Sequence, residues 1–170
     1  YNQVTGALGR STPEAEGMDP KGISDYLEAV KKSGQDIHSL MILRHGKVIS
    51  EQWFGDNAPA NNHVMHSVSK TFTSTAVGFA VNENRLKLTD RVISFFPGEL
   101  PENISPRLAA LEVRHLLTMS VGHDVDPTGD IRSSNESWEK LFLALPLEYD
   151  PGTRFVYNSL ATYMLSAIIQ

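Results

Sequence analysis

Apolar residues recur at three- and four-residue intervals over several stretches of the chain, which is the spacing of helices that bury one side. The stretch that begins at Asp19 and Pro20 has the N-cap residue and the first-turn proline of a helix start, and it ends near Gly34. The helices predicted from this spacing cover residues 20–33, 67–82, 138–145 and 159–170, with a shorter one over residues 112–119.

Two runs of residues near the N-terminus indicate strands. Residues 37–43 are nearly all apolar, and residues 48–54 are rich in residue types that favour strands. Gly46 lies between the two runs and suits a tight turn. We therefore predict an antiparallel hairpin, although two strands alone are only marginally stable in water. Helices combined with an antiparallel hairpin give the fold class α+β.

Composition excludes several classes of protein. The 170 residues are 41% hydrophobic and 21% charged, as in an ordinary globular domain. A net charge of -5 leaves no basic surface for nucleic acid, and no apolar run is long enough to span a bilayer. Cysteine is absent, which excludes disulfides, thiolate metal sites and a cysteine nucleophile. The compartment stays open between bacterial-type export to the periplasm and the cytoplasm, because the chain begins at Tyr1.

Ser67 is the first candidate for chemistry, because it lies where an Asn-rich loop changes into the helix predicted over residues 67–82. Lys70 is three residues on, so both side chains lie on one side of that helix and the amine can reach the hydroxyl. A serine hydroxyl becomes a nucleophile when a nearby group takes its proton. The N-terminus of a helix also supplies free N–H groups that suit an oxyanion.

The Ser-x-x-Lys spacing is weak support by itself, since this composition predicts about one occurrence by chance. A second copy runs from Ser137 to Lys140, after natural N-cap residues and at the start of another predicted helix. We interpret Ser137 as part of a first helical turn and expect Lys140 to point to solvent. From the spacing alone, an N-cap is also the simpler interpretation of Ser67.

Three motifs in a fixed order change that interpretation. They are Ser67-Val68-Ser69-Lys70, Val113-Arg114-His115-Leu116-Leu117-Thr118-Met119-Ser120-Val121-Gly122-His123 and Pro151-Gly152-Thr153-Arg154-Phe155-Val156-Tyr157-Asn158-Ser159. Together they resemble the serine β-lactamase-related family, which groups class C β-lactamases, penicillin-binding-protein-like D-alanyl-D-alanine carboxypeptidases and related serine esterases. The resemblance runs from about Gly17 to the last residue, and three ordered motifs are far more specific than one.

The resemblance implies a β-lactamase/transpeptidase-like α/β sandwich with Ser67, Lys70 and Tyr157 as the catalytic residues. Ser67 attacks an amide or ester and forms an acyl-enzyme, which water then hydrolyses. Lys70 and Tyr157 handle the proton, and as a coupled pair they leave open which one is the base. Ser159 and Asn158 are expected to bind substrate. The family usually has Tyr-x-Asn, whereas here Asn158 comes one residue early and Ser159, with its shorter reach, takes the usual place.

The family's Lys- or His-based triplet ending in Gly, which lies on a later strand, does not occur after the three motifs. We expect an extended lead-in over residues 1–18 and an incomplete β-lactamase-like domain over residues 19–170. Within it, a helix and hairpin are expected over residues 19–55 and a helical region over residues 67–170. The remaining strands and the second oxyanion donor would lie in a missing C-terminal segment. Uncovered apolar surfaces predict self-association or dependence on that segment.

No metal or organic cofactor is expected. His63 and His66 have a spacing seen in metal sites, but they lie in an Asn-rich loop before a helix. The aspartates of residues 124–130 lack the glycine and glutamate of a calcium loop. We predict that His115 is a partly buried, hydrogen-bonded side chain. The aromatic residues predicted to lie in the core are Trp53, Phe54, Phe72, Phe79, Phe95 and Phe96.

The resulting hypothesis is a serine hydrolase that acts on a small-molecule or peptide substrate: a β-lactam, a D-Ala peptide or a small ester. The alternative is a non-catalytic or truncated recognition module of the same fold that lacks turnover. The presence of Ser67, Lys70 and Tyr157 favours the enzyme. The displaced Asn158 and the absent Lys- or His-based triplet favour the recognition module.

Overall fold

The computed structural model describes residues 8–170, which fall into two compact units, residues 8–64 and residues 65–170. Part of the predicted lead-in, residues 1–7, lies outside the described residues. The rest of it contains a short 3-10 helix, η1 (Glu14–Glu16), and a parallel bridge between Arg10 and Val48. The lead-in therefore adds a short third segment beside the hairpin.

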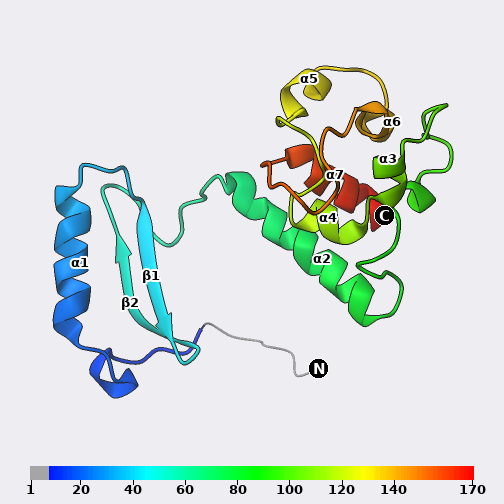
Figure 1. Ribbon diagram of the computed structural model, residues 1–170. Helices are drawn as coiled ribbons and strands as arrows, with labels where there is room; N and C mark the ends of the chain where they lie inside the picture. Colours follow the sequence, from blue (N-terminus) through cyan, green and yellow to red (C-terminus); the bar gives the residue numbers. More distant parts are fainter. Residues whose placement is uncertain (1–7) are drawn as a thin grey trace. The chain divides into compact units, whose positions relative to one another are not determined.

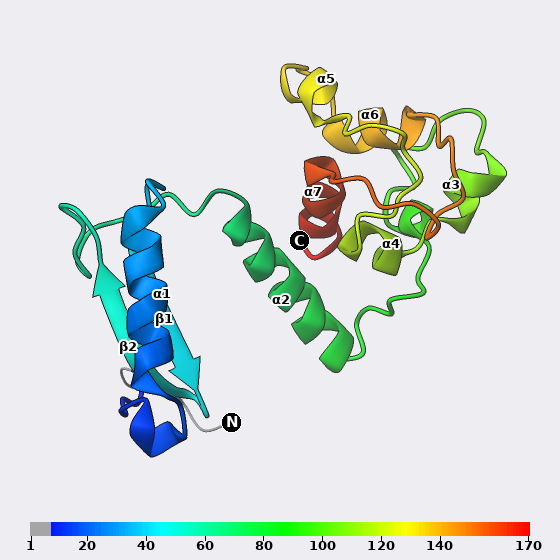
Figure 2. The same cartoon turned by 60° about the vertical axis from the view of Figure 1, so that its left-hand side comes forward.

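The first helix, α1 (Pro20–Lys32), forms where the N-cap and the apolar spacing predicted it. Asp19 accepts a hydrogen bond from the Lys21 N–H at 2.8 Å, which satisfies one of the free donors at the helix start. Ile23 and Val30 are buried on the inner side of the helix. In both ribbon views, α1 runs alongside the hairpin (Figures 1 and 2).

The predicted hairpin is confirmed by strands β1 (Ser39–Arg44) and β2 (Lys47–Trp53), which pair antiparallel. His45 and Gly46 form the turn with φ values of 49° and 75°, the left-handed pair that a tight hairpin turn requires. The register shifts between Ile42 and Leu43, so β2 carries one extra residue there. This irregularity explains how two consecutive residues of β2, Val48 and Ile49, are both buried.

A buried carboxylate ties the lead-in to the hairpin turn. Glu16 is 8% exposed, and its side chain accepts hydrogen bonds from Lys47 Nζ at 2.8 Å and from His45 Nδ1 at 2.9 Å. Its backbone carbonyl accepts from Arg44 Nε at 2.7 Å. The bond from Lys47, followed by those from Ser11 and His45, lowers the pKa of Glu16 from 4.5 to about 2. Glu16 is therefore ionised in the folded unit at neutral pH.

The second unit is helical. Its elements are η2 (His66–Ser69), α2 (Lys70–Asn82), η3 (Val92–Phe95), α3 (Pro106–Ala110), α4 (Val113–Leu117), α5 (Thr128–Arg132), α6 (Trp138–Ala144) and α7 (Ser159–Ile168). The four helices predicted in this region are confirmed, with ends shifted by a few residues. The sequence did not predict α3 and α5, because both lie in stretches with the proline, glycine, serine and aspartate that are typical of loops.

Helix α7 lies at the centre of this unit, where it contacts α2, α4 and α6 (Figures 1 and 2). Its inner side is apolar throughout and is covered by buried residues from the other helices. Among the buried side chains of this core are Val77, Leu116, Leu143, Leu160 and Met164. The burial of α7 fixes the position of the segment that precedes it, and that segment carries Tyr157.

The predicted apolar side of α2 is wrong. Phe72 is 66% exposed and Phe79 is 59% exposed, whereas the residue of α2 that enters the core is Val77. Of the other aromatic residues predicted to lie in the core, only Phe96 is fully buried; Trp53, Phe54 and Phe95 are partly buried. The spacing of large apolar residues does not distinguish the side of α2 that packs on α7 from the side that is open.

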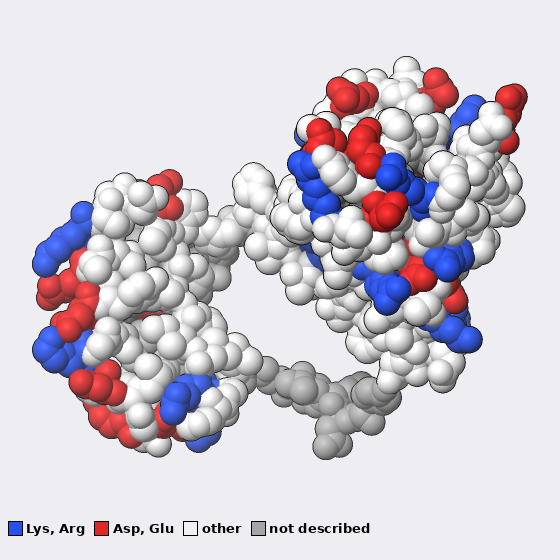
Figure 3. Space-filling model, viewed as in Figure 1, with Lys and Arg blue, Asp and Glu red and all other residues white. Residues whose placement is uncertain are grey.

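None of the helices in residues 8–170 combines the length and the apolar character needed to cross a bilayer. On the face that Figure 3 shows, basic and acidic side chains are interspersed on both units.

We predict that Glu16→Gln destabilises the first unit at neutral pH but not in strong acid. Because the folded-state pKa of Glu16 is depressed, its carboxylate stabilises the unit above pH 4.5, and this contribution is lost as the pH falls towards 2. Urea unfolding followed by the fluorescence of Trp53, in a Trp138→Phe background, measures the difference. Glu14→Gln, at an exposed position of the same 3-10 helix, is the control. The prediction would be contradicted if the difference in unfolding free energy between Glu16→Gln and the unmodified chain stayed constant from pH 7 to pH 2.

We also predict that the 170-residue chain self-associates through the open side of α2. Exposed phenylalanines of this kind favour association with other apolar surfaces. The double change Phe72→Glu and Phe79→Glu is expected to reduce the association, which light scattering after size exclusion measures over a range of concentrations. Ser74→Glu, at an exposed polar position of the same helix, is the control for added charge. A monodisperse monomer of the unmodified chain at every concentration would rule the prediction out.

Candidate active site

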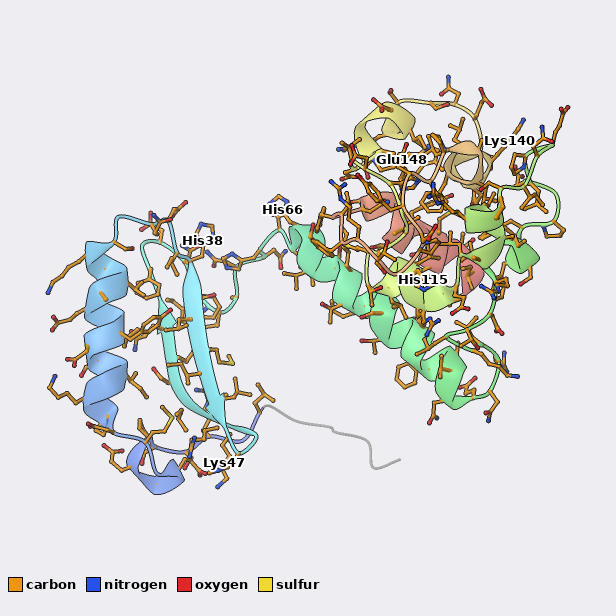
Figure 4. The ribbon with its side chains drawn as sticks, viewed as in Figure 1. His38, Lys47, His66, His115, Lys140 and Glu148 are labelled. Carbon is orange, nitrogen blue, oxygen red and sulfur yellow. The ribbon has the colours of Figure 1, made fainter. Side chains whose placement is uncertain are left out.

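Ser67 lies in the single 3-10 turn, η2, that leads into α2, rather than in the first turn of the α-helix itself. The residue before it, His66, has a φ of 44°, a left-handed conformation that is uncommon for a residue other than glycine. Figure 4 shows His66 at the beginning of α2. This sharp change of direction leaves the Ser67 side chain exposed and its N–H in the first turn, where backbone donors lack partners from a preceding turn.

Lys70 is the first residue of α2, and its side chain lies on the same side as Ser67, as the three-residue spacing predicted. Its Nζ atom donates a hydrogen bond to Ser67 Oγ at 3.2 Å. Lys70 is partly buried, so the ammonium group stays close to the hydroxyl instead of extending into solvent. The positive charge therefore lies directly beside the candidate nucleophile.

Tyr157 reaches the same point from a distant part of the sequence. Its Oη atom lies 2.5 Å from Ser67 Oγ, although the two residues are 90 positions apart. Lys70 Nζ lies 5.3 Å from the centre of the tyrosine ring, within the range of a cation–π contact. Tyr157 is 45% exposed. The three residues that the resemblance groups as catalytic thus form one continuous hydrogen-bonded set.

The surroundings of the Tyr157 phenol favour its ionised form. The hydrogen bond with Ser67 makes the largest contribution to lowering the pKa of Tyr157 from 10, followed by the hydrogen bond with Lys70. The positive charge of Lys70 and a hydrogen bond with Ser159 lower the pKa further, while partial burial opposes the shift. A lowered phenol pKa gives Tyr157 the capacity to accept a proton nearer to neutral pH than an ordinary tyrosine.

The two residues predicted to bind substrate differ in placement. Ser159, the first residue of α7, is partly buried, and its hydroxyl is close enough to Tyr157 to affect the phenol. Asn158 is only 1% exposed, and it is the N-cap of α7, where its Oδ1 atom accepts a hydrogen bond from the Ala161 N–H. Its amide nitrogen lies against His123. Asn158 therefore presents no free polar atom to a substrate in this structure.

The second Ser-x-x-Lys copy has the structural role predicted for it. Ser137 is the N-cap of α6, and its hydroxyl accepts a hydrogen bond from the Lys140 N–H at 3.2 Å. The Lys140 side chain is exposed on the outside of α6 (Figure 4). His115 on α4 is buried and accepts a hydrogen bond from the Glu112 N–H through Nδ1, as a capping residue does. Burial, followed by the charge of Arg114, lowers the pKa of His115.

Among residues 8–170, no cluster of three or more His, Asp or Glu side chains has the arrangement of a metal site. His63 lies against His38, with their Nδ1 atoms 3.2 Å apart, and not against His66. In the aspartate loop, Asp124 forms an ion pair with Arg154 at 2.8 Å. The side chains considered as metal ligands are therefore spread over separate local contacts.

The sequence analysis missed the residues that hold Tyr157 in place. Met119 and His123 both contact the segment around Tyr157, through bonds to Val156 and Asn158. Both residues belong to the second motif, whose position in the fixed order was the available signal. Nothing in the motif itself indicates that its backbone and its last side chain face the third motif.

Comparison with known proteins identifies the family. The family model described as Beta-lactamase matches residues 29–170, so the chain belongs to the Beta-lactamase family, and the predicted resemblance and fold class are confirmed.

Three relatives illustrate the match. The "Probable fimbrial assembly protein FimD, serogroup H1" of Dichelobacter nodosus is 34% identical over 110 residues, which cover 61% of this chain and 27% of that protein. The 6-aminohexanoate-dimer hydrolase of Paenarthrobacter ureafaciens is 27% identical over 101 residues, or 58% of this chain and 26% of that protein. The solved structure titled "Beta-Lactamase/D-Alanine Carboxypeptidase from Pseudomonas syringae" has a TM-score of 0.62 at 26% identity and covers 88% of this chain and 43% of that one. The chain thus spans about a quarter of the length of these curated relatives.

We predict that Ser67→Ala raises the pKa of Tyr157, because the bond with Ser67 makes the largest contribution to lowering that pKa. Lys70→Gln is expected to raise it as well, through the loss of a hydrogen bond and a positive charge. NMR titration of protein labelled at the tyrosine Cζ atoms measures the pKa, with Tyr157→Phe to assign the signal. Ser137→Ala, in the structural copy of the motif, is the control. An unchanged Tyr157 pKa in Ser67→Ala would show that the two side chains are not paired in solution.

Proposed function

We propose that this chain carries the nucleophile and the proton-transfer groups of a serine hydrolase, which cleaves an amide or ester through an acyl-Ser67 intermediate. The observation that carries the proposal is the hydrogen-bonded chain from Lys70 Nζ through Ser67 Oγ to Tyr157 Oη, with distances of 3.2 Å and 2.5 Å. Membership of the Beta-lactamase family supports it, as do two relatives whose printed names describe hydrolytic enzymes.

The direction of the hydrogen bonds favours Tyr157 over Lys70 as the base in the first step. Lys70, as an ammonium, donates to Ser67 Oγ, and when Tyr157 is a phenolate the Ser67 hydroxyl is the donor in its bond with Tyr157 Oη. The lowered pKa of Tyr157 makes the phenolate accessible, and the adjacent ammonium stabilises it. Lys70 then serves as the positive charge that favours both the phenolate and the developing alkoxide. Tyr157 is therefore our proposal for the base, a choice that the sequence leaves open.

In the acylation step, Ser67 Oγ attacks the carbonyl carbon while its proton passes to Tyr157. The carbonyl oxygen becomes an oxyanion, for which the Ser67 N–H is one donor. When the bond to the leaving nitrogen or oxygen breaks, the Tyr157 hydroxyl returns its proton to the leaving group. In deacylation, Tyr157 takes a proton from water, the hydroxide attacks the acyl carbon, and Ser67 Oγ leaves and regains the proton.

Candidate substrates are a β-lactam, a D-Ala peptide or a small ester. With Asn158 turned inwards, Ser159 is the neighbouring side chain that we propose as a hydrogen-bond donor to the substrate carbonyl. A hydroxyl donates one hydrogen bond, whereas an amide group donates two, so we expect apolar contacts to contribute more to substrate orientation. The exposed Phe155, two residues before Tyr157, is suited to such a contact.

A recognition module without turnover is the second candidate. It is favoured by the burial of Asn158, which removes from the surface the amide that the family's Tyr-x-Asn motif usually offers. The name of the FimD relative, which refers to fimbrial assembly and not to hydrolysis, also favours this candidate. Such a module would keep the fold and the exposed site but would not transfer an acyl group to Ser67.

We predict that a fluorophosphonate modifies the chain once, at Ser67. Ser67 Oγ forms a bond to phosphorus, fluoride leaves, and the Ser67 proton passes to Tyr157 and then to solvent. Intact mass spectrometry detects the adduct, which Ser67→Ala is expected to abolish and Tyr157→Phe to slow strongly. Ser137→Ala is the matched control and keeps full labelling. If the folded chain gives no adduct, the acyl-transfer proposal fails and the recognition module is favoured.

A further inference from the structure

Tyr157 is exposed, so its phenol holds its place only if the backbone on both sides is fixed. Both neighbouring N–H groups are directed at one residue, Met119. The Val156 N–H donates to the Met119 carbonyl oxygen at 3.0 Å, and the Asn158 N–H donates to the Met119 sulfur at 3.5 Å. The residues on both sides of Tyr157 are thus hydrogen-bonded to the same residue of the second motif.

The segment from Met119 to His123 continues this pairing along the chain. Gly152 N–H donates to the Ser120 carbonyl at 2.7 Å, and Tyr149 N–H donates to the Gly122 carbonyl at 3.0 Å. Gly122 has a φ of 113°, and a Cβ atom there would lie 2.3 Å from the Tyr149 carbonyl oxygen. Any residue with a Cβ atom at position 122 would force the backbone to move away from the Tyr149 carbonyl. The second motif is therefore a rigid template for the segment that carries Tyr157.

The template ends in a pair of buried side chains, His123 and Asn158. The Oδ1 atom of Asn158 accepts the Ala161 N–H at 3.0 Å, which identifies the other amide atom as the donor. That donor, Nδ2, lies 3.0 Å from His123 Nδ1. His123 Nδ1 must therefore accept and carry no proton, so the ring proton is on Nε2.

Burial makes this bond hard to replace. Asn158 is 1% exposed and His123 is 4% exposed, with the edge of the Phe142 ring against the imidazole. Within residues 8–170, His123 Nε2 has no hydrogen-bond partner, so the bond through Nδ1 is the polar contact that holds the ring. Loss of the acceptor would leave a buried amide donor without a partner, which is costly, and Asn158 would shift to satisfy it. Because Asn158 directly follows Tyr157, the phenol would shift too.

We propose that His123, as a neutral imidazole, is a positioning residue for Tyr157: it accepts the Asn158 amide and thereby holds the phenol against Ser67. The inference deepens the proposed function and rests on the role of Tyr157 in it. It assigns His123 no contact with substrate. The bond also links the N-cap of α7 to the second motif, so the packing of the helix and the placement of the phenol depend on the same amide group.

The charged groups around His123 bear on its protonation. Asp124, Asp130 and Glu148 line the same cavity of about 130 Å³ as His123, and Asp126 is near enough to favour the imidazolium, as is Glu148. Burial outweighs these carboxylates and lowers the pKa of His123 from 6.5. The neutral form therefore persists below the usual histidine range. In stronger acid, a proton on Nδ1 would face the Asn158 amide protons and break the bond.

The test compares His123→Leu, which removes the acceptor, with His123→Asn, whose amide oxygen can replace Nδ1. We expect His123→Leu to slow the labelling of Ser67 by a fluorophosphonate about tenfold to a hundredfold, as a misplacement near 1 Å does. It should also raise the Tyr157 pKa in the NMR titration, because the contacts with Ser67 and Lys70 loosen. His123→Asn should restore both values towards those of the unmodified chain.

Two further variants separate positioning from general loss of stability. Asn158→Ser keeps a good N-cap for α7 but removes the amide donor, so it should reproduce the effects of His123→Leu. It also decides the question if His123→Leu does not fold. Val92→Ala removes part of a buried apolar side chain of η3 and should lower the melting temperature while leaving the Tyr157 pKa unchanged. All measurements are made well below the melting temperature of each variant.

The outcomes are distinguishable. An unchanged Tyr157 pKa and an unchanged labelling rate in both His123→Leu and Asn158→Ser would overturn the inference. A raised Tyr157 pKa that His123→Asn reverses would support it, even if no variant or unmodified chain reacts with the fluorophosphonate. In that case the proposed acyl transfer fails while the positioning of Tyr157 stands.

Discussion

The packing of α7 against α2 and α4 is the constraint on which the candidate site depends. Ser67 and Lys70 lie at the beginning of α2, whereas Tyr157 immediately precedes the N-cap of α7. A hydroxyl-to-hydroxyl distance of 2.5 Å across 90 residues exists only while the two helices keep one register. A shift of one helical turn moves a side chain by about 5 Å, which is more than enough to separate the pair. The packing of the apolar core therefore sets the distance between the Ser67 and Tyr157 hydroxyl groups.

Much of the fold could be predicted from the sequence because its signals are local. The N-cap at Asp19, the glycine of the hairpin turn and the apolar spacing of α7 each depend on a few neighbouring residues. The inner side of α2 could not be predicted in this way. Phe72 and Phe79 are larger and more apolar than Val77, yet Val77 is the residue that packs in the core. Which side of a helix is covered depends on partners far away in the sequence.

The candidate site was predictable in its members but not in its geometry. The spacing of Ser67 and Lys70 fixes their relation, because both lie within one helical turn. Only the order of the three motifs predicted that Tyr157 belongs with Ser67, since no local pattern indicates a contact between residues 90 positions apart. The template formed by residues 119–123 was not predictable, because it acts mainly through backbone carbonyls and a left-handed residue. Those features carry almost no side-chain signature.

The position of Asn158 shows how a shift of one residue along the sequence turns a side chain from the surface into the interior of the protein. Residues that alternate in an extended segment point to opposite sides, so an asparagine directly after Tyr157 points away from the tyrosine ring and into the protein. There its oxygen caps α7 and its nitrogen meets His123. Ser159 then takes the outward position beside the phenol, with a smaller and single donor. The departure from the usual motif thus places the Asn158 amide in the interior, where this one group joins the helix cap to the template.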